Sequence, residues 1–167
     1  MYYILSQLKI RKVIMSDKVI ENITTNTRLA TIQCIYSVIF MGEKLSGKMM
    51  RYFKNKSFLS EEDTKEDKSP KINSKLFSYL VKGIIRNQDI IDEVINQNLK
   101  IDIKKNDQLV ISIIRAGAFE ILFRENTPAG VIIAEYTKIA NEFYPSTKSG
   151  LVNAVLDKIA KAKKEAS

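Results

Sequence analysis

Apolar side chains recur at steps of three and four residues through most of this chain, which is the spacing of one face of an α-helix. In "RLATIQCIYSVIF", residues 28–40, the apolar face includes Leu29, Ile32 and Ile35. No segment alternates apolar and polar residues as a half-buried β-strand does, and no segment repeats another. The sequence therefore predicts an all-α protein of about seven helices.

Capping residues and helix breakers indicate where these helices begin and end. Thr27 or Asn26 is the expected N-cap of the first helix, and Gly42 is its expected stop. A second helix is expected over about residues 44–53. Asp89 would cap the helix that follows the polar corner "RNQD".

The most apolar segment is "DQLVISIIRAGAFEILFR", residues 107–124, and we expect it to be a central helix that is buried nearly all round. It contains Arg115 and Glu120, whose charges are costly in a core unless they are paired or hydrogen-bonded. We therefore expect both residues to find partners on other helices. Pro128 is expected in the first turn of the next helix.

Two segments depart from the helical pattern. Residues 1–22 are expected to be an N-terminal extension, either flexible or the product of a wrongly assigned start, because translation from Met15 would remove residues 1–14. The intact mass of the native protein would decide this. A mobile loop is expected near residues 54–74, where "KNKSFLSEEDTKEDKSP" mixes charge with serine. The remainder, residues 23–167, is expected to form one helical domain.

The chain has no histidine and a single cysteine, Cys34, so it has no disulfide framework, no Cys/His zinc site and no imidazole base. Cys34 lies among isoleucines and is expected to be a small core residue. Asp89, Asp92 and Glu93 could form a carboxylate pair for acid–base chemistry, but they also suit the negative first turn of a helix, which is the interpretation we favour. We expect no enzymatic activity, no catalytic residue, no metal and no cofactor.

No apolar stretch approaches the roughly 18 residues that a membrane helix requires. The opening "MYYILSQLKIRK" has a short apolar run with its basic residues after it, unlike a secretory signal. A cytoplasmic protein without membrane contact is expected. The formal net charge of +8, from 27 Lys and Arg against 19 Asp and Glu, favours a polyanionic partner without proving one.

The segment "IIRAGAFEILFRENTPAGVIIAEYTKIANEFYPSTKSGLVNAVLDKIAK", residues 113–161, resembles the C-terminal half of the NusB family of bacterial transcription antitermination factors. The matching features are the Arg115 to Glu120 spacing, a helix opened by Thr127-Pro128, and a closing Val-Asn-x-Val-Leu-Asp helix that starts at Val152. The first helix is also similar to that of the family, with Arg28 in register. The resemblance extends over about residues 26–160.

This resemblance implies two packed helical subdomains, no catalysis, and a role as an RNA-binding adaptor. Family members pair with the ribosomal protein NusE, and the pair binds the boxA element of single-stranded nascent RNA. They thereby support an antiterminating RNA polymerase complex during ribosomal RNA synthesis. A homodimer is also compatible with the family.

The resemblance further implies that the start of the first helix meets RNA, where the family carries a run of arginines. Only Arg28 of that run is present, and Thr25, Asn26 and Thr27 occupy the preceding positions. Hydroxyls and amides donate hydrogen bonds to phosphate but add no charge. Lys148 lies in a loop that borders the RNA path in the family, which makes it a further candidate for phosphate contact. Thr25, Asn26, Thr27, Arg28 and Lys148 are the expected RNA-binding residues.

Two alternatives stay open. The threonine-rich tract could be only a helix cap, with Lys148 a solvated charge, or Thr24 with its neighbours could face RNA while Lys18, Arg11 and Lys12 supply displaced charge. Correspondingly, the protein could be an RNA-binding antitermination factor or a protein-interaction adaptor that binds NusE with little RNA affinity of its own.

Overall fold

The computed structural model describes residues 22–40, 42, 45–47, 49–51, 71–99, 102–145 and 147–166. Within these ranges the chain forms six α-helices and no strand, so the prediction of an all-α fold is confirmed. The helices are α2 (Ile23–Ile35), which continues as the π-helical turn η1 (Tyr36–Phe40), α4 (Ser74–Arg86), α5 (Gln88–Leu99), the short 3₁₀ turn η2 (Ile103–Lys105), α6 (Gln108–Phe123), α7 (Ala129–Phe143) and α8 (Ser149–Ala166).

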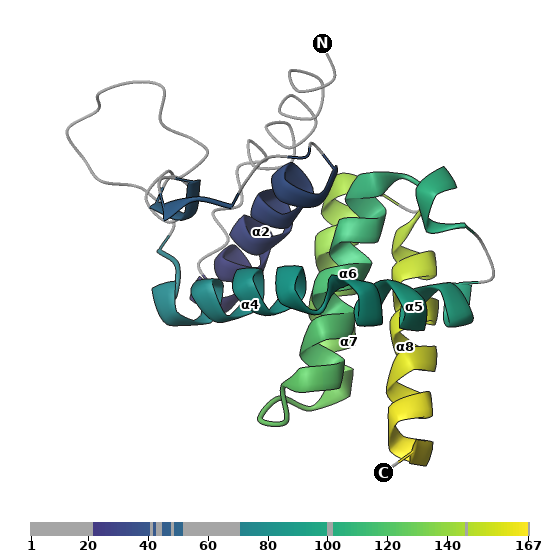
Figure 1. Ribbon diagram of the computed structural model, residues 1–167. Coiled ribbons are helices and arrows are strands. Elements are labelled where there is room, and N and C mark those ends of the chain that lie inside the picture. The colour runs from purple at the N-terminus through teal and green to yellow at the C-terminus, as the bar shows by residue number, and fades with distance from the viewer. Residues whose placement is uncertain are drawn as a thin grey trace.

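Helix α6 is the centre of the fold, as its apolar sequence predicts, and each residue from Leu109 to Ile121 is buried. Helices α7 and α8 run beside it, while α4 and α5 follow one another across the group (Figure 1). A Cβ atom on Gly117 would lie 2.7 Å from a methyl carbon of Leu156 on α8, so this glycine allows the two helices to approach closely.

Helices α2 and α4 share a smaller apolar cluster beside the main core, which matches the expected division into two packed subdomains. Cys34 lies in this cluster with Phe77 and Val81 and is fully buried, so its assignment to the core is confirmed. A Cβ atom on Gly83 of α4 would lie 2.2 Å from the ring of Phe119 on α6, so α4 and α6 meet closely at this glycine. Both subdomains therefore pack on α6.

The N-cap predictions are wrong in detail. Helix α2 is capped by Asn22, whose Oδ1 accepts a hydrogen bond from the backbone N–H of Thr24 at 2.9 Å, so Asn26 and Thr27 lie inside the helix. Asp89 lies in the first turn of α5, which begins one residue earlier. The reason is that a tract rich in Asn and Thr offers several capping residues, and packing selects among them.

Pro128 stands at the N-cap of α7 rather than within its first turn. Gly42 follows η1 and has a φ of 69°, the left-handed conformation that suits a glycine beyond a helix end. The expected second helix over residues 44–53 is described only in part, with residues 47 and 49–51 helical.

Asn22, at the end of the N-terminal segment, and Asn73, near the end of the predicted loop, both contact the helices. Asn22 caps α2, and the backbone N–H of Asn73 donates to Oγ1 of Thr27 at 2.8 Å. The side chain of Asn73 in turn caps α4 through Lys75 N–H at 3.1 Å. Residues 1–21, with Met15 among them, and residues 54–70 lie outside the described residues. The expectations of an extension and a mobile loop therefore stay predictions.

Candidate nucleic-acid interface

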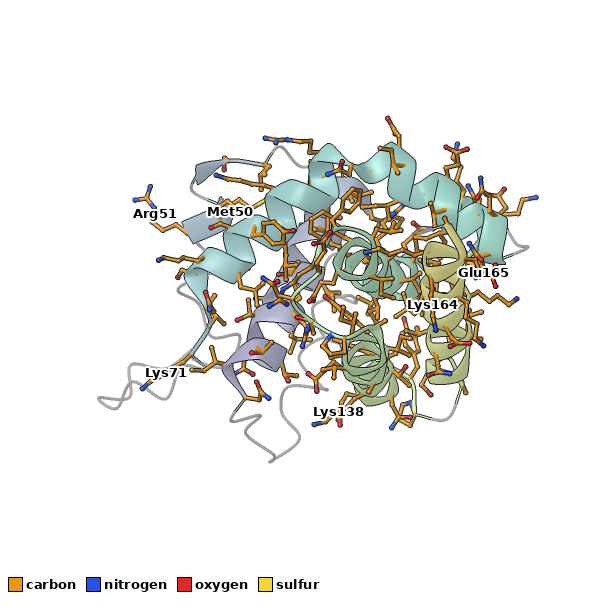
Figure 2. The ribbon with its side chains drawn as sticks, turned by 90° about the horizontal axis from the view of Figure 1, so that it is seen from below. Met50, Arg51, Lys71, Lys138, Lys164 and Glu165 are labelled. Carbon is orange, nitrogen blue, oxygen red and sulfur yellow. The ribbon has the colours of Figure 1, made fainter. Side chains whose placement is uncertain are left out.

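The first turns of α2, where RNA contact is expected, are packed between α4 and α7. Thr25, Asn26, Thr27 and Arg28 have exposed fractions of only 2%, 9%, 0% and 2%. The amide of Asn26 donates to the backbone carbonyl of Lys71 at 3.4 Å, and the Lys71 side chain itself points outward (Figure 2). The polar composition of this tract thus serves contacts inside the protein.

The hydroxyl groups of the tract are used in the same way. Oγ1 of Thr25 donates to Oε2 of Glu135 on α7 at 2.7 Å. Oγ1 of Thr27 donates to the carbonyl of Ile23 at 2.6 Å and accepts from the backbone of Asn73. The hydroxyl of Thr25 therefore joins the start of α2 to α7. The hydroxyl of Thr27 joins it to the preceding turn of α2 and to the residue that caps α4.

Arg28 is held by two carboxylates. Its Nε and Nη2 donate to Oε1 and Oε2 of Glu120 at 2.8 and 3.0 Å, which is the two-point geometry of a strong guanidinium–carboxylate pair. Its Nη1 lies 3.4 Å from Oε2 of Glu135, and its guanidinium lies 5.6 Å from the ring centroid of Tyr136. The guanidinium group of Arg28 therefore points into the helical core.

Glu120 accepts two further hydrogen bonds, from the hydroxyl of Tyr136 at 2.7 Å and from Nη1 of Arg124 at 2.6 Å. Burial by itself would raise the pKa of Glu120, but the hydrogen bonds and charge of Arg28, with the bonds from Tyr136 and Arg124, outweigh burial and hold that pKa below its ordinary value. The expectation that Glu120 has partners on other helices is confirmed, because Arg28 comes from α2 and Tyr136 from α7.

Arg115 also has the expected partner on another helix. Its Nε and Nη2 donate to the two carboxylate oxygens of Asp92 on α5 at 2.6 and 2.9 Å. Asp92, one of the three acidic residues considered for acid–base chemistry, is therefore engaged in an ion pair between α5 and α6. Among the described residues, no group of three or more His, Cys, Asp and Glu side chains is placed to hold a metal ion. None of the described helices has the length and apolarity needed to span a membrane.

Lys148 lies in the turn between α7 and α8 and is partly exposed, with a side-chain exposed fraction of 38%. Its Nζ lies 3.3 Å from Oδ2 of Asp107 and 5.2 Å from the ring centroid of Tyr144. The Tyr144 hydroxyl donates to the same carboxylate at 2.6 Å. Burial by itself would raise the pKa of Asp107, but the Tyr144 hydrogen bond and the Lys148 charge lower it below its ordinary value.

The candidate residues form two separate groups rather than one. Arg28 binds Glu120 near the end of α6, whereas Lys148 binds Asp107, which caps the start of α6. Glu120 and Asp107 are 13 positions apart along this helix, or about 20 Å at 1.5 Å per residue. RNA contact by either group stays a prediction. The burial of Arg28 was not foreseen, although an unpartnered Glu120 on the central helix was a signal that a buried cation was needed.

The fold and this ion-pair network define an all-helical protein in which the first helix is joined to a buried central helix through Arg28 and Glu120. The model of the NusB family matches residues 25–161. The chain belongs to the NusB family, and the resemblance noted in the sequence is confirmed.

The chain is similar to proteins named transcription antitermination protein NusB. It is 36% identical to that of Rhizobium rhizogenes over 136 residues, which cover 80% of this chain and 83% of that protein. It is 31% identical to that of Caulobacter vibrioides, again over 80% of this chain and 89% of that protein.

Two solved structures share this fold. The chain matches T. maritima NusB with a TM-score of 0.62 and 25% identity, over 82% of this chain and 89% of that one. It also matches a chain in a structure titled "Crystal Structure of a Plectonemic RNA Supercoil", with a TM-score of 0.67 and 21% identity, over 86% of this chain and 97% of that one. The second likeness supports the fold alone.

Proposed function

We propose that this protein is an RNA-binding transcription antitermination factor that pairs with ribosomal protein NusE on boxA RNA. It would act in the cytoplasm as part of an RNA polymerase antitermination complex during ribosomal RNA synthesis. The observation that carries the proposal is the family match over residues 25–161. The formal net charge of +8 supports it, because phosphate contacts dominate the affinity of proteins for nucleic acids.

The two groups of candidate residues would contribute differently to this function. Lys148 is partly exposed and its ammonium faces a single carboxylate, so it suits a direct phosphate contact. Arg28 is engaged with Glu120 and Glu135, so its contribution would be to hold the start of α2 in position. The start of α2 would be supported by the buried side chains of Thr25, Asn26 and Thr27. Thr24 is half-exposed beside them.

A second candidate function is a protein-interaction adaptor that binds NusE and has little RNA affinity of its own. The engagement of Arg28 favours it, because the one arginine retained at the start of the first helix is paired with carboxylates rather than presented to solvent. The two candidates share the NusE partner and differ in whether RNA is bound.

The test is RNA binding by the purified full-length chain, with and without NusE, on a short boxA-like single strand and on a scrambled strand of equal length. Measurements at two salt concentrations separate the contribution of phosphate contacts to RNA affinity from the contributions that do not depend on salt. Salt-sensitive binding that prefers the boxA strand and tightens with NusE supports the antitermination factor. Binding to NusE with no gain in RNA affinity supports the adaptor and contradicts the first proposal.

A further inference from the structure

The outer face of α4 carries a stripe of exposed residues, three of them basic and one aromatic. Lys75, Tyr79, Lys82 and Arg86 are all exposed and stand at intervals of four, three and four residues, so they share one side of the helix. We call these four residues the α4 stripe. The opposite side of α4 carries Phe77 and its buried apolar neighbours, which accounts for the fold of the helix without the stripe.

The α4 stripe is positively charged, and α4 itself contains no carboxylate; Asp89, three residues after Arg86, lies in α5 and forms no ion pair with it. Residues 71–88 contain four Lys and Arg and no Asp or Glu. Neither Lys75, Lys82 nor Arg86 has an ion-pair partner within the described part of the chain. A solvated surface helix commonly places acids three or four residues from its bases, and α4 does not. The stripe therefore offers three cations to an external anion.

Two exposed aromatic rings lie at the stripe, Tyr79 within it and Phe123 beside it at the end of α6. Tyr79 is 45% exposed, its ring centroid lies 5.5 Å from that of Phe119, and its hydroxyl donates to the carbonyl of Phe123 at 3.1 Å. Phe123 is 40% exposed and lies 5.2 Å from the same Phe119 ring. Since Phe119 is buried in the core, both outer rings are held in fixed positions while part of each ring meets solvent.

The N-terminal end of the stripe lies close to the start of α2 in the chain of contacts. Asn73, which caps α4, donates its backbone N–H to Thr27 of α2 at 2.8 Å, and Lys75 follows two residues later. From Lys75 to Arg86 the stripe extends over 11 residue steps of α4, or about 16 Å. The stripe is therefore long enough to contact several successive nucleotides of a single strand.

We propose that the α4 stripe and Phe123 bind single-stranded RNA, with Lys75, Lys82 and Arg86 contacting phosphates and the two aromatic rings stacking on bases. Cations that follow a backbone, interleaved with exposed aromatic rings, are the usual composition of a single-strand binding surface. An acidic protein would meet the cations equally well but gives no reason for two rings held with exposed faces. The inference rests on the proposed function, since it assigns an additional RNA surface to the same protein.

The experiment compares two double charge reversals in the full-length chain. K82E/R86E removes two cations of the stripe, and K158E/K164E makes the same change in net charge on exposed positions of α8. Affinity for a boxA-like single strand is measured by fluorescence anisotropy at several salt concentrations. We expect K82E/R86E to lose at least about tenfold in affinity, with a salt slope lower by about 1.4 for two lost phosphate contacts. The control is expected to change much less.

The aromatic part is tested separately at Tyr79. Y79A should lose roughly tenfold in RNA affinity, while Y79F, which keeps the ring and loses only the hydroxyl, should bind RNA as the unaltered chain does. Thermal unfolding of both variants checks that the helix is intact. If Y79F lost as much RNA affinity as Y79A, the hydrogen bond to Phe123 rather than stacking would be responsible, and the assignment of Tyr79 to base contact would be overturned.

These measurements distinguish a stripe that does not bind RNA from a protein that does not bind RNA at all. If the unaltered chain binds RNA but K82E/R86E and K158E/K164E weaken binding equally, the stripe is not an RNA surface and the proposed function stands. If K82E/R86E keeps its RNA affinity but loses NusE, the stripe is a protein surface and the inference is again overturned. If the unaltered chain binds no RNA with or without NusE, both proposals fail together.

Discussion

Arg28 and Glu120 stand 92 positions apart in the chain and form a two-point ion pair in the protein interior, with donor–acceptor distances of 2.8 and 3.0 Å. Glu120 has no exposed surface and Arg28 almost none. The pair joins the first described helix to the central one. The arginine at the start of the first described helix is therefore a core residue.

Arg28→Ala should therefore act on stability before it acts on any ligand. It leaves the Glu120 carboxylate buried with part of its hydrogen bonding lost, and breaking a buried pair in this way costs about 3–5 kcal/mol. Arg28→Lys should recover only part of that loss, because one ammonium cannot reproduce the two-point geometry. Urea unfolding followed by circular dichroism measures both variants.

Lys148→Ala is the control for Arg28→Ala, since Lys148 is partly exposed and its pair with Asp107 is expected to contribute at most about 1 kcal/mol. Equal stability losses for the two variants would contradict the assignment of Arg28 to the core. Any loss of RNA affinity on substituting Arg28 is to be interpreted only after the fold of the variant has been checked.

The loss of folding stability in acid should depend in part on Asp107. The pKa of Asp107 is lowered in the folded state, so its contribution is present above the unfolded pKa, near 3.9, and is lost as the pH falls through the folded value. Asn at this position keeps an oxygen for the cap of α6 but does not titrate. Asp107→Asn should be less stable at pH 7 and lose less stability between pH 5 and pH 3.

Urea midpoints at several pH values measure this difference. Glu120, whose pKa is also lowered in the folded protein, remains in Asp107→Asn and keeps part of the acid sensitivity. An acid dependence in Asp107→Asn as steep as that of the unaltered chain would show that Asp107 has no lowered pKa.

Gly83→Ala should destabilise the protein even though alanine favours a helix by about 1 kcal/mol over glycine. The added Cβ would lie 2.2 Å from the Phe119 ring, and displacing that ring disturbs the packing of Tyr79 and Phe123. We expect a net loss of about 1–3 kcal/mol in the free energy of unfolding. Gly150→Ala is the matched control, because a Cβ there meets nothing within 4 Å and a small gain is expected.

Lys148→Ala tests the second candidate RNA contact. If its ammonium binds a phosphate of a single strand, the salt slope of RNA binding should fall by about 0.7, with a modest loss of affinity at low salt. Anisotropy titrations from about 50 to 200 mM salt measure the slope. An unchanged slope would mean that Lys148 serves only its contacts with Asp107 and Tyr144.

Much of the fold could be predicted from local pattern. The apolar run of 107–124 predicted a buried central helix, which α6 is, because a helix that is apolar all round has no face suited to solvent. The charges of Arg115 and Glu120 required partners on other helices, and both have them. The cost of an unpaired buried charge made this a reliable inference.

The candidate site was less predictable. The resemblance predicts RNA contact for Thr25 to Arg28, but nothing in their own sequence distinguishes an outward turn from an inward one. A threonine hydroxyl or a guanidinium binds a phosphate or a carboxylate by the same hydrogen bonds. The position of Glu135 and Glu120 beside α2 depends on how α6 and α7 pack.

The sequence by itself therefore determined that the protein is all-α, which helix is central and which family it belongs to, because periodicity, the position of charges in apolar segments and motif order are properties of the chain. Only the tertiary structure decided which way Arg28 points, that Lys148 lies at the opposite end of α6, and that Tyr79 shares a surface with Phe123. These relationships join residues distant in sequence, and their energies depend on contacts that exist only once the helices have packed.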